Sequence, residues 1–248
     1  MLLKNKTAVV TGASRGIGLR IIESFSSNGV SKIFACLREK NNDLLERFKK
    51  IEKQFSNQII PIELDLSRPE MIKKAVDEIF SQQNQIDILV NNAGKISTSL
   101  IQMTSMKNFK EIFEVNVFGQ IQFTQSILKK MTNKNGGSIV FISSTSATDS
   151  VVGRAAYSSS KNAINSFALT LSKELGRKKI RVNVISPGLT NTDMMKNNTP
   201  QSIIDEVAKQ SSLQRVAEPE EISNSVTAIC SELFSFMTGQ IIRIDGGM

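Results

Sequence analysis

Short apolar runs alternate with longer amphipathic stretches along the whole chain. Runs such as AVV at 8–10, ILV at 88–90 and SIVFI at 138–142 show no two-residue alternation of apolar and polar positions. Strands of this kind are buried on both faces, as parallel sheets require. Seven runs of similar character occupy 7–12, 31–38, 59–67, 86–94, 137–144, 180–188 and 239–247. The pattern therefore predicts seven parallel strands.

Apolar positions at helical spacing fill the intervals between these runs. One such stripe contains Phe109, Ile112, Phe113, Val117, Ile121, Phe123, Ile127 and Leu128. A second contains Ile164, Phe167, Ala168, Leu171 and Leu175 and ends at Gly176. Regular alternation of strand and helix predicts an α/β fold, namely one Rossmann-like, doubly wound domain over 1–248 with a seven-stranded parallel sheet and helices on both faces. The more weakly patterned segment 189–221 has room for two short helices and for a mobile substrate lid.

Composition excludes several kinds of chemistry. The 248 residues include no histidine, which removes the commonest metal ligand and the commonest general base near neutral pH. We therefore expect no metal site and no Ser-His-Asp or Cys-His catalysis. Cys36 and Cys230 lie far apart and form no CxxC pair, as is usual in a reducing compartment. With no signal peptide and no membrane span evident in the sequence, we expect a cytoplasmic protein.

The net charge of +8 raises the question of an acidic partner. The basic residues are scattered along the chain, and 6% aromatic content without tryptophan leaves few surfaces on which bases could stack. The composition thus favours a small-molecule substrate over a nucleic-acid partner.

A glycine-rich segment, TGASRGIG at 11–18, joins the first predicted strand to the first predicted helix. Small residues at Gly12, Gly16 and Gly18 would let the backbone approach a pyrophosphate at the positive end of that helix. The spacing G-x-x-x-G-x-G differs from the general G-x-G-x-x-G fingerprint, so a glycine turn without a ligand stays open as the alternative.

The end of the second predicted strand bears on which dinucleotide would bind. An NAD site usually has an acidic residue there for the ribose 2′-hydroxyl, whereas this chain has Leu37 and Arg38. Arg15 in the glycine turn and Arg38 would suit a 2′-phosphate, because guanidinium groups bind phosphate through paired, charge-assisted hydrogen bonds. We therefore predict NADP(H), and Glu39 keeps NAD(H) open as the alternative.

Tyr157, the only tyrosine, stands four residues before Lys161. On a helix this spacing places both side chains on one face. A nearby ammonium favours the phenolate and would lower the pKa of the phenol toward the neutral range. A partly buried tyrosine above a surface lysine is an ordinary alternative, and the spacing alone leaves both interpretations open.

Several motifs occur together in a characteristic order. They are TGASRGIG at 11–18, NNAG at 91–94, VNVFG at 115–119, FISSTSA at 141–147, YSSSK at 157–161, ISPG at 185–188 and DGGM at 245–248. Because it contains these motifs in this order, the chain resembles the short-chain dehydrogenase/reductase superfamily over its whole length. The resemblance implies an oxidoreductase in which Tyr157 donates a proton to a substrate carbonyl as hydride arrives from the nicotinamide. Lys161 would hold the ribose hydroxyls and lower the pKa of the phenol.

Two further catalytic positions follow from the resemblance. Ser144 would hydrogen-bond the substrate oxygen, and Ser143 and Ser146 are its rivals. Asn116 would anchor a water in a proton relay from Lys161, and its alternative is a paired core amide.

The same resemblance implies a set of cofactor contacts along the carboxyl edge of the sheet. The set is Gly12, Ser14, Arg15, Gly16, Ile17, Gly18, Arg38, Asp65, Leu66, Asn91, Asn92, Ala93, Gly94, Tyr157, Lys161, Pro187, Gly188 and Thr190. Asp65 would accept a hydrogen bond from the adenine amine, and its alternative is a turn-capping residue.

Within the superfamily, the PG-x-x-x-T-D-M run at 187–194 and the DGGM ending look most like 3-oxoacyl-[acyl-carrier-protein] reductases. Acidic carrier proteins would suit a basic face, although exposed lysines often serve only solvation. That face comprises Lys129, Lys130, Lys173, Arg177, Lys178 and Lys179. Alternatives are a dehydrogenase of a sugar, polyol or small ketone and, more remotely, a non-catalytic dinucleotide-binding or RNA-associated protein. The resemblance also implies a homodimer or homotetramer, paired through the helices that carry Asn116 and Tyr157.

Overall fold

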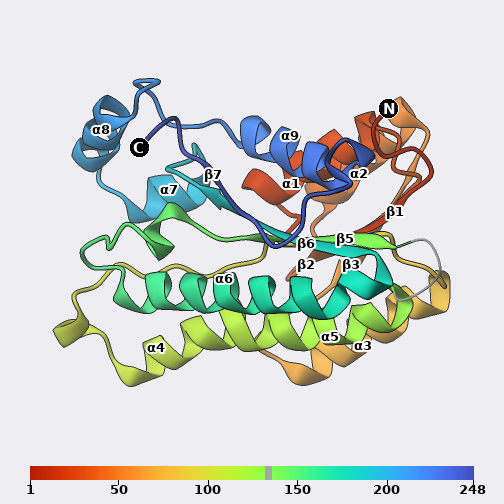
Figure 1. Ribbon diagram of the computed structural model, residues 1–248, viewed down its shortest axis with the longest axis horizontal. Helices are drawn as coiled ribbons and strands as arrows, with labels where there is room; N and C mark the ends of the chain where they lie inside the picture. The colour runs from red at the N-terminus through yellow and green to blue at the C-terminus, as the bar shows by residue number, and fades with distance from the viewer. Residues whose placement is uncertain (132–135) are drawn as a thin grey trace.

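The computed structural model describes residues 1–131 and 136–248, and within them one open sheet forms the centre of the molecule (Figure 1). Its strands are β1 (Thr7–Thr11), β2 (Lys32–Leu37), β3 (Gln58–Glu63), β4 (Ile88–Asn91), β5 (Gly137–Ile142), β6 (Ile180–Pro187) and β7 (Ile241–Ile244). They lie in the order β3-β2-β1-β4-β5-β6-β7, and each pairs in parallel with its neighbours. The predicted seven-stranded parallel sheet is confirmed.

Helices cover both faces of this sheet, also as predicted (Figure 1). They are α1 (Gly16–Ser27), α2 (Asn42–Phe55), α3 (Pro69–Gln82), α4 (Met106–Phe113), α5 (Gly119–Met131), α6 (Ala155–Leu175), α7 (Asp193–Asn198), α8 (Gln201–Gln210) and α9 (Pro219–Cys230). Single 3-10 turns occupy Ile101–Met103, Thr145–Ala147, Gly176–Lys178 and Glu232–Phe234, and a π turn spans Glu114–Phe118. Helices α1, α2 and α9 pack on one face, and α3, α5 and α6 pack on the other.

The doubly buried strands explain why the apolar runs lack alternation. In β1, Ala8 and Val10 pack under α1 and α9, whereas Val9 between them faces α3 and α5. Phe25 of α1 and Phe123 of α5 are fully buried on opposite faces. Because the inner strands contribute to two cores, most of their positions are apolar, and the buried Asn183 of β6 is an exception whose amide donates to the Met237 carbonyl oxygen.

The order of the strands determines where a ligand cleft can form. The chain moves outward from β1 through β2 to β3 and then returns to place β4 on the other side of β1. In open parallel sheets, ligands bind beyond the carboxyl ends of the strands at such a reversal. The loops that follow β1, β4, β5 and β6 all emerge at this edge.

The segment between β6 and β7 contains the two short helices predicted for it, α7 and α8, before α9 begins. It is attached to its own base by a parallel bridge between Thr190 and Ala217. Its movement as a substrate lid stays a prediction. In the part of the chain that the structure describes, no helix combines the length and apolarity needed to cross a bilayer.

Candidate active site

The glycine turn after β1 is built by close contact with the loop after β4. Gly12 has a φ of +66°, and a Cβ on Gly18 would overlap the Gly12 carbonyl oxygen. The Asn92 amide donates to the carbonyl oxygens of Thr11 and Gly12 at 3.0 and 3.1 Å. Backbone N–H groups of Asn92 and Ala93 both donate to the Thr11 hydroxyl at 3.0 Å. The two motifs therefore form one rigid unit, in which the Asn92 side chain shapes the turn.

Tyr157 and Lys161 lie in the first turns of α6 and are both buried. The Lys161 Nζ is 5.8 Å from the centre of the Tyr157 ring and donates to the Ile142 carbonyl oxygen at 2.7 Å. That carbonyl ends β5, so the hydrogen bond fixes the lysine against the carboxyl edge of the sheet. A Cβ on Gly94 would lie 3.4 Å from Nζ, which places the NNAG loop directly beside the ammonium.

Burial dominates the electrostatics of this pair. It raises the pKa of the Tyr157 phenol, while a hydrogen bond with Ser144 and the charge of Arg154 act in the lowering direction. Burial also lowers the pKa of Lys161 to about 8. The spacing of the pair predicts that the ammonium brings the pKa of the phenol down, but in the chain alone desolvation outweighs the lowering influences. The phenol is therefore protonated at neutral pH.

Of the three serines considered after β5, Ser144 is the one that reaches the phenol. Its hydroxyl also accepts from the Ser146 N–H at 3.2 Å, which orients it at the start of a 3-10 turn. Ser143 is buried and its hydroxyl donates to the Lys161 carbonyl oxygen at 3.4 Å. Geometry thus favours Ser144 as the second hydroxyl of the site.

Asn116 lies in the π turn between α4 and α5, where the predicted continuous helix is interrupted. Its amide donates to the Lys95 carbonyl oxygen at 2.8 Å and to the Ser160 hydroxyl at 3.0 Å, and its oxygen accepts from the Lys95 N–H at 2.7 Å. Both amide hydrogens are therefore occupied by protein partners. This pairing favours the core-amide interpretation for the side chain. The water relay stays a prediction, although π turns often occur at functional sites.

The residues predicted to contact the adenosine half lie at the same edge, after β1, β2 and β3. Arg15 and Arg38 are both exposed. Asp65 accepts from the Ser67 N–H and hydroxyl at 2.9 and 2.7 Å, so it does cap a turn. Desolvation raises the pKa of Asp65, but these hydrogen bonds and the nearby Arg38 and Arg68 outweigh it and leave the pKa lowered.

The segment after β6 closes the other side of the cleft. Gly188 donates to the Ile244 carbonyl oxygen at 2.9 Å, and a Cβ there would lie 2.9 Å from Asp245 Cα. The Thr190 hydroxyl donates to the Gly188 carbonyl oxygen at 3.0 Å. A Cβ on Gly16 would lie 3.2 Å from the Thr192 methyl group, so the start of α7 lies against the glycine turn.

Three buried polar residues at this edge were missed in the sequence. Gln120 donates to the Ala93 carbonyl oxygen at 2.7 Å, Ser160 binds Asn116, and Arg154 lies one helical turn before Tyr157. Gln120 and Ser160 interrupt apolar helical positions, which is a usable signal. No signal in the sequence indicates that Arg154 is buried, because arginine is usually exposed.

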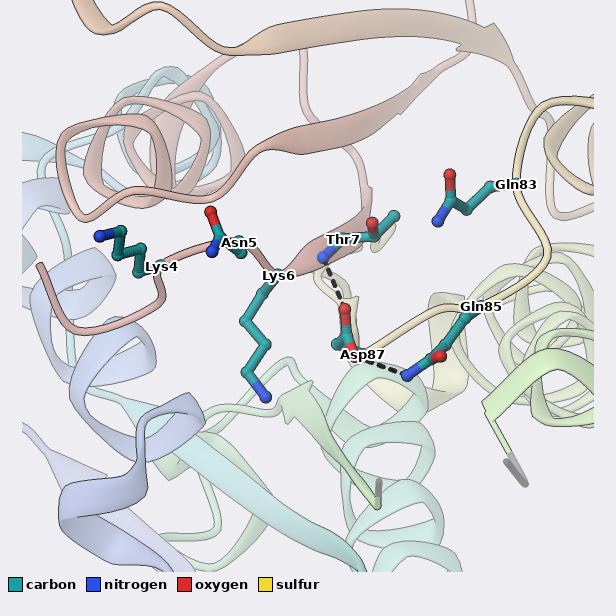
Figure 2. Close-up of a pocket in the computed structure, with 7 residues that line it drawn as sticks. All are labelled: Lys4, Asn5, Lys6, Thr7, Gln83, Gln85 and Asp87. Atoms are coloured by element: carbon teal, nitrogen blue, oxygen red, sulfur yellow. Dashed lines mark hydrogen bonds between the residues drawn. The ribbon is translucent and has the colours of Figure 1, made fainter. Parts of the chain in front are cut away.

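The opposite, amino edge of the sheet has a different character. A hollow of about 360 Å³ lies there, and in it Asp87 accepts from the Thr7 N–H at 2.7 Å and from the Gln85 amide at 3.2 Å. Figure 2 shows the side chains that line it. The predicted basic face also lies toward this edge. Helical rise places Lys173 roughly 24 Å from Tyr157 along α6. Within the described residues, no cluster of histidine, cysteine or carboxylate side chains has the composition of a metal site.

The carboxyl edge has the features that a dinucleotide requires. The first turn of α1 contains no acidic residue, and no side chain of the described residues caps its N-terminus, so its N–H groups are available to phosphate. The absence of side chains at Gly12 and Gly18 leaves the backbone open to close approach. Gly94 leaves space beside Lys161 where a ribose hydroxyl could bind.

Fold and site together define a dinucleotide-dependent oxidoreductase with a tyrosine-lysine pair. Residues 12–248 match the family model described as Enoyl-(Acyl carrier protein) reductase. The chain belongs to the short-chain dehydrogenase/reductase family. It is 36% identical to 3-oxoacyl-[acyl-carrier-protein] reductase FabG of Aquifex aeolicus, over 99% of this chain and 98% of that protein.

Other relatives act on different alcohols and ketones. The chain is 30% identical to 7alpha-hydroxysteroid dehydrogenase of Escherichia coli, over 99% of this chain and 94% of that protein. Its structure superimposes with a TM-score of 0.91 on L-sorbose reductase from Gluconobacter frateurii, solved with NADPH and L-sorbose, at 29% identity and with 99% and 97% of the two chains covered.

Proposed function

We propose that this protein is an NADP(H)-dependent reductase that converts a carbonyl to a secondary alcohol, with a 3-oxoacyl thioester on acyl-carrier protein as substrate. The observation that carries the proposal is the buried Tyr157–Lys161 pair, held beside the NNAG loop at the carboxyl edge. The 36% identity to a 3-oxoacyl-[acyl-carrier-protein] reductase supports the choice of substrate.

The chain's own residues would orient the carbonyl and supply the proton. Bound NADPH would supply the hydride. The Tyr157 phenol, protonated at neutral pH because burial raises its pKa, would donate its proton to the carbonyl oxygen. The Ser144 hydroxyl would donate a second hydrogen bond to that oxygen as negative charge develops on it. Lys161, held by Ile142, would bind the ribose hydroxyls.

Cofactor choice rests on charge near the adenosine end of the cleft. Arg15 and Arg38 would bind the 2′-phosphate of NADP(H), and Arg38 lies close enough to Asp65 to lower the pKa of that carboxyl. The NADPH-bound sorbose reductase supports this choice, and the NADH-bound 7 alpha-hydroxysteroid dehydrogenase, at 30% identity and a TM-score of 0.92, keeps NAD(H) as the alternative.

Exposed apolar side chains around the cleft bear on the substrate. Leu100 and Ile101 follow β4, Val151 and Val152 follow β5, and Met194 lies in α7. The first two of these segments are joined by a hydrogen bond from the Ser99 N–H to the Gly153 carbonyl oxygen at 2.9 Å. An apolar rim suits an acyl chain and disfavours a sugar. It would also suit a hydroxysteroid, which we therefore keep as the second candidate.

Carrier-protein docking would require a second chain. Lys173 and the basic residues after α6 lie far from the Tyr157 of their own chain. If two chains pair their α5 and α6 helices in antiparallel fashion, the basic end of one chain reaches the cleft of the other. We propose such a homodimer, alone or within a homotetramer. Free, buried Cys36 and Cys230 support the cytoplasm as its compartment.

The test is oxidation of NADPH, followed by absorbance, with acetoacetyl-coenzyme A, a 3-oxoacyl carrier protein, a 7-oxo bile acid and L-sorbose as substrates. We expect the highest kcat/KM with the carrier-bound thioester. A higher value with the bile acid would establish the second candidate. A higher value with L-sorbose, or equal rates with NADH, would refute the substrate or cofactor assignment respectively.

A further inference from the structure

Arg154 is a buried arginine whose charge has no counter-ion among the described residues. It stands at the start of α6 and is only 9% exposed. Across residues 1–131 and 136–248, no carboxylate forms an ion pair with it. Its Nη1 is buried with no hydrogen-bond partner in the same residues. Burying a cation in this way costs folding free energy, because no opposite charge compensates the loss of its hydration.

The other end of the guanidinium joins α6 to the segment between α7 and α8. Nη2 donates to the Asn198 carbonyl oxygen at 3.2 Å and to the Thr199 hydroxyl at 3.4 Å. The Thr98 hydroxyl donates to the same Asn198 oxygen at 3.4 Å. Three segments that follow different strands therefore meet at Arg154, and each of them borders the cleft.

Arg154 also stands close to the reacting group. It is the residue just before α6 and precedes Tyr157 by three residues, so the two side chains leave the backbone about one helical turn apart. The charged side chains near the phenol are Arg154, which immediately precedes α6, and Lys161 on α6, and the Ser144 hydroxyl approaches it from the loop after β5. The charge of Arg154 favours the phenolate, which is the anion that would compensate the unpaired guanidinium.

We propose that Arg154 is a positioning residue that fastens the α7–α8 corner to the start of α6 and stabilises the phenolate that Tyr157 becomes when it gives up its proton. The proposal builds on the proposed carbonyl reduction and adds to it a link between the segment bordering the substrate and the proton donor.

The composition of the chain allows a test that needs no substrate. Tyr157 is the only tyrosine and tryptophan is absent, so the ultraviolet absorbance of tyrosinate reports one phenol. We would titrate the wild type, Arg154→Met, Arg154→Lys and a matched control, Arg177→Met, whose arginine is exposed just beyond the far end of α6. The midpoint should rise by about one pH unit in Arg154→Met and stay near the wild-type value in Arg154→Lys and in the control.

Hydrogen exchange tests the mechanical half of the proposal. Amides of residues 194–204 should exchange several-fold faster in Arg154→Met than in the wild type, and at the wild-type rate in Arg177→Met. An unchanged phenol midpoint, or unchanged exchange in 194–204, would overturn the proposal. If Arg154→Met fails to fold, Arg154→Gln replaces it in both measurements, with the same outcomes expected and the same outcomes overturning the proposal. Both readouts are independent of turnover, so failure of the proposed substrate would not affect them.

Discussion

The two edges of the same parallel sheet differ in how they treat polar groups. At the carboxyl edge, Lys161 and Tyr157 are buried, and neither has a carboxylate partner among the described residues. Burial lowers the pKa of Lys161 and raises the pKa of Tyr157, so it favours the neutral form of each side chain. At the amino edge, Asp87 is satisfied by two hydrogen bonds beside an open hollow (Figure 2). Asp87 is thus paired, whereas the charge of Lys161 is buried without a compensating carboxylate among the described residues, and this costly burial supports the proposal that the chemistry takes place at the carboxyl edge.

Within the described part of the chain, the hollows at the amino edge lack a comparable cluster of ionisable groups poised for chemistry. A second hollow of about 500 Å³ at the amino edge is lined in part by Cys230, but burial raises the pKa of that thiol to about 12. The thiol is therefore unreactive at neutral pH. What distinguishes the two edges is the placement of ionisable groups against backbone carbonyls and glycine turns.

The largest contrast between the edges should come from two glycines. Gly18→Ala places a Cβ against the Gly12 carbonyl oxygen, so we expect NADPH affinity to fall by about 100-fold or more, or the turn to unfold at a cost of several kcal/mol. A Cβ on Gly176 would meet no atom of the described residues within 4 Å, so Gly176→Ala should leave affinity unchanged and raise stability by up to about 1 kcal/mol. Fluorescence titration and thermal unfolding measure both. Equal NADPH affinities in the two variants would show that the glycine turn takes no part in cofactor binding.

Lys161→Met should stabilise the cofactor-free protein. The pKa of Lys161 is about 8 in the folded state and 10.5 as its ordinary value, so the unfolded state binds more protons between these pH values. The penalty for burying the charge is complete below pH 8 and disappears as the pH rises to 10.5. We expect the variant to be more stable by about 2 kcal/mol at pH 7, with the difference shrinking toward pH 10.5. Denaturant unfolding across this range measures it, and a constant difference would contradict the assignment.

Arg38→Asp should weaken the preference for NADPH over NADH by about tenfold, since it replaces a phosphate-binding charge with one that suits a 2′-hydroxyl. Arg177→Asp makes the same change of charge at the other edge, far from the adenosine end of the cleft of its own chain, and should leave the preference unaltered. The ratio of kcat/KM for the two cofactors is the measurement. If Arg177→Asp also changed this ratio tenfold, the net charge of the protein, and not phosphate binding by Arg38, would explain the result.

The smallest effect is expected at the amino edge. Asp87→Ala leaves the Thr7 N–H without its acceptor and should lower the free energy of unfolding by about 1 kcal/mol. Because Asp87 lies away from the cleft, kcat and KM should stay at wild-type values. A fall in kcat would show that the amino edge takes part in the reaction.

The sequence predicted the strands well because doubly buried strands leave an uninterrupted apolar run. It predicted one continuous helix where the π turn at Glu114–Phe118 separates α4 from α5, since a single i→i+5 turn leaves no periodic signal. No local sequence pattern shows that β4 lies next to β1 in the sheet. The doubly wound arrangement was predicted only from the alternation of strands and helices.

The sequence motifs predicted which residues form the candidate site, but not the contacts between them. The spacing of Tyr157 and Lys161 indicated the pair, but the pairing of Asn92 with Gly12 and of Asn116 with Lys95 depends on contacts between distant segments. The distance between the basic face and Tyr157 could not be predicted from the sequence either. It follows from the fold, because α6 runs from one edge of the sheet to the other.

We propose that the Tyr157 phenol delivers the proton at the carboxyl edge, and the decisive variant is Tyr157→Phe. We would measure kcat with NADPH and acetoacetyl-coenzyme A, together with the Kd for NADPH. The account predicts a loss of kcat of about 1,000-fold or more with NADPH affinity nearly unchanged. A phenylalanine variant that keeps a tenth or more of wild-type kcat would contradict it.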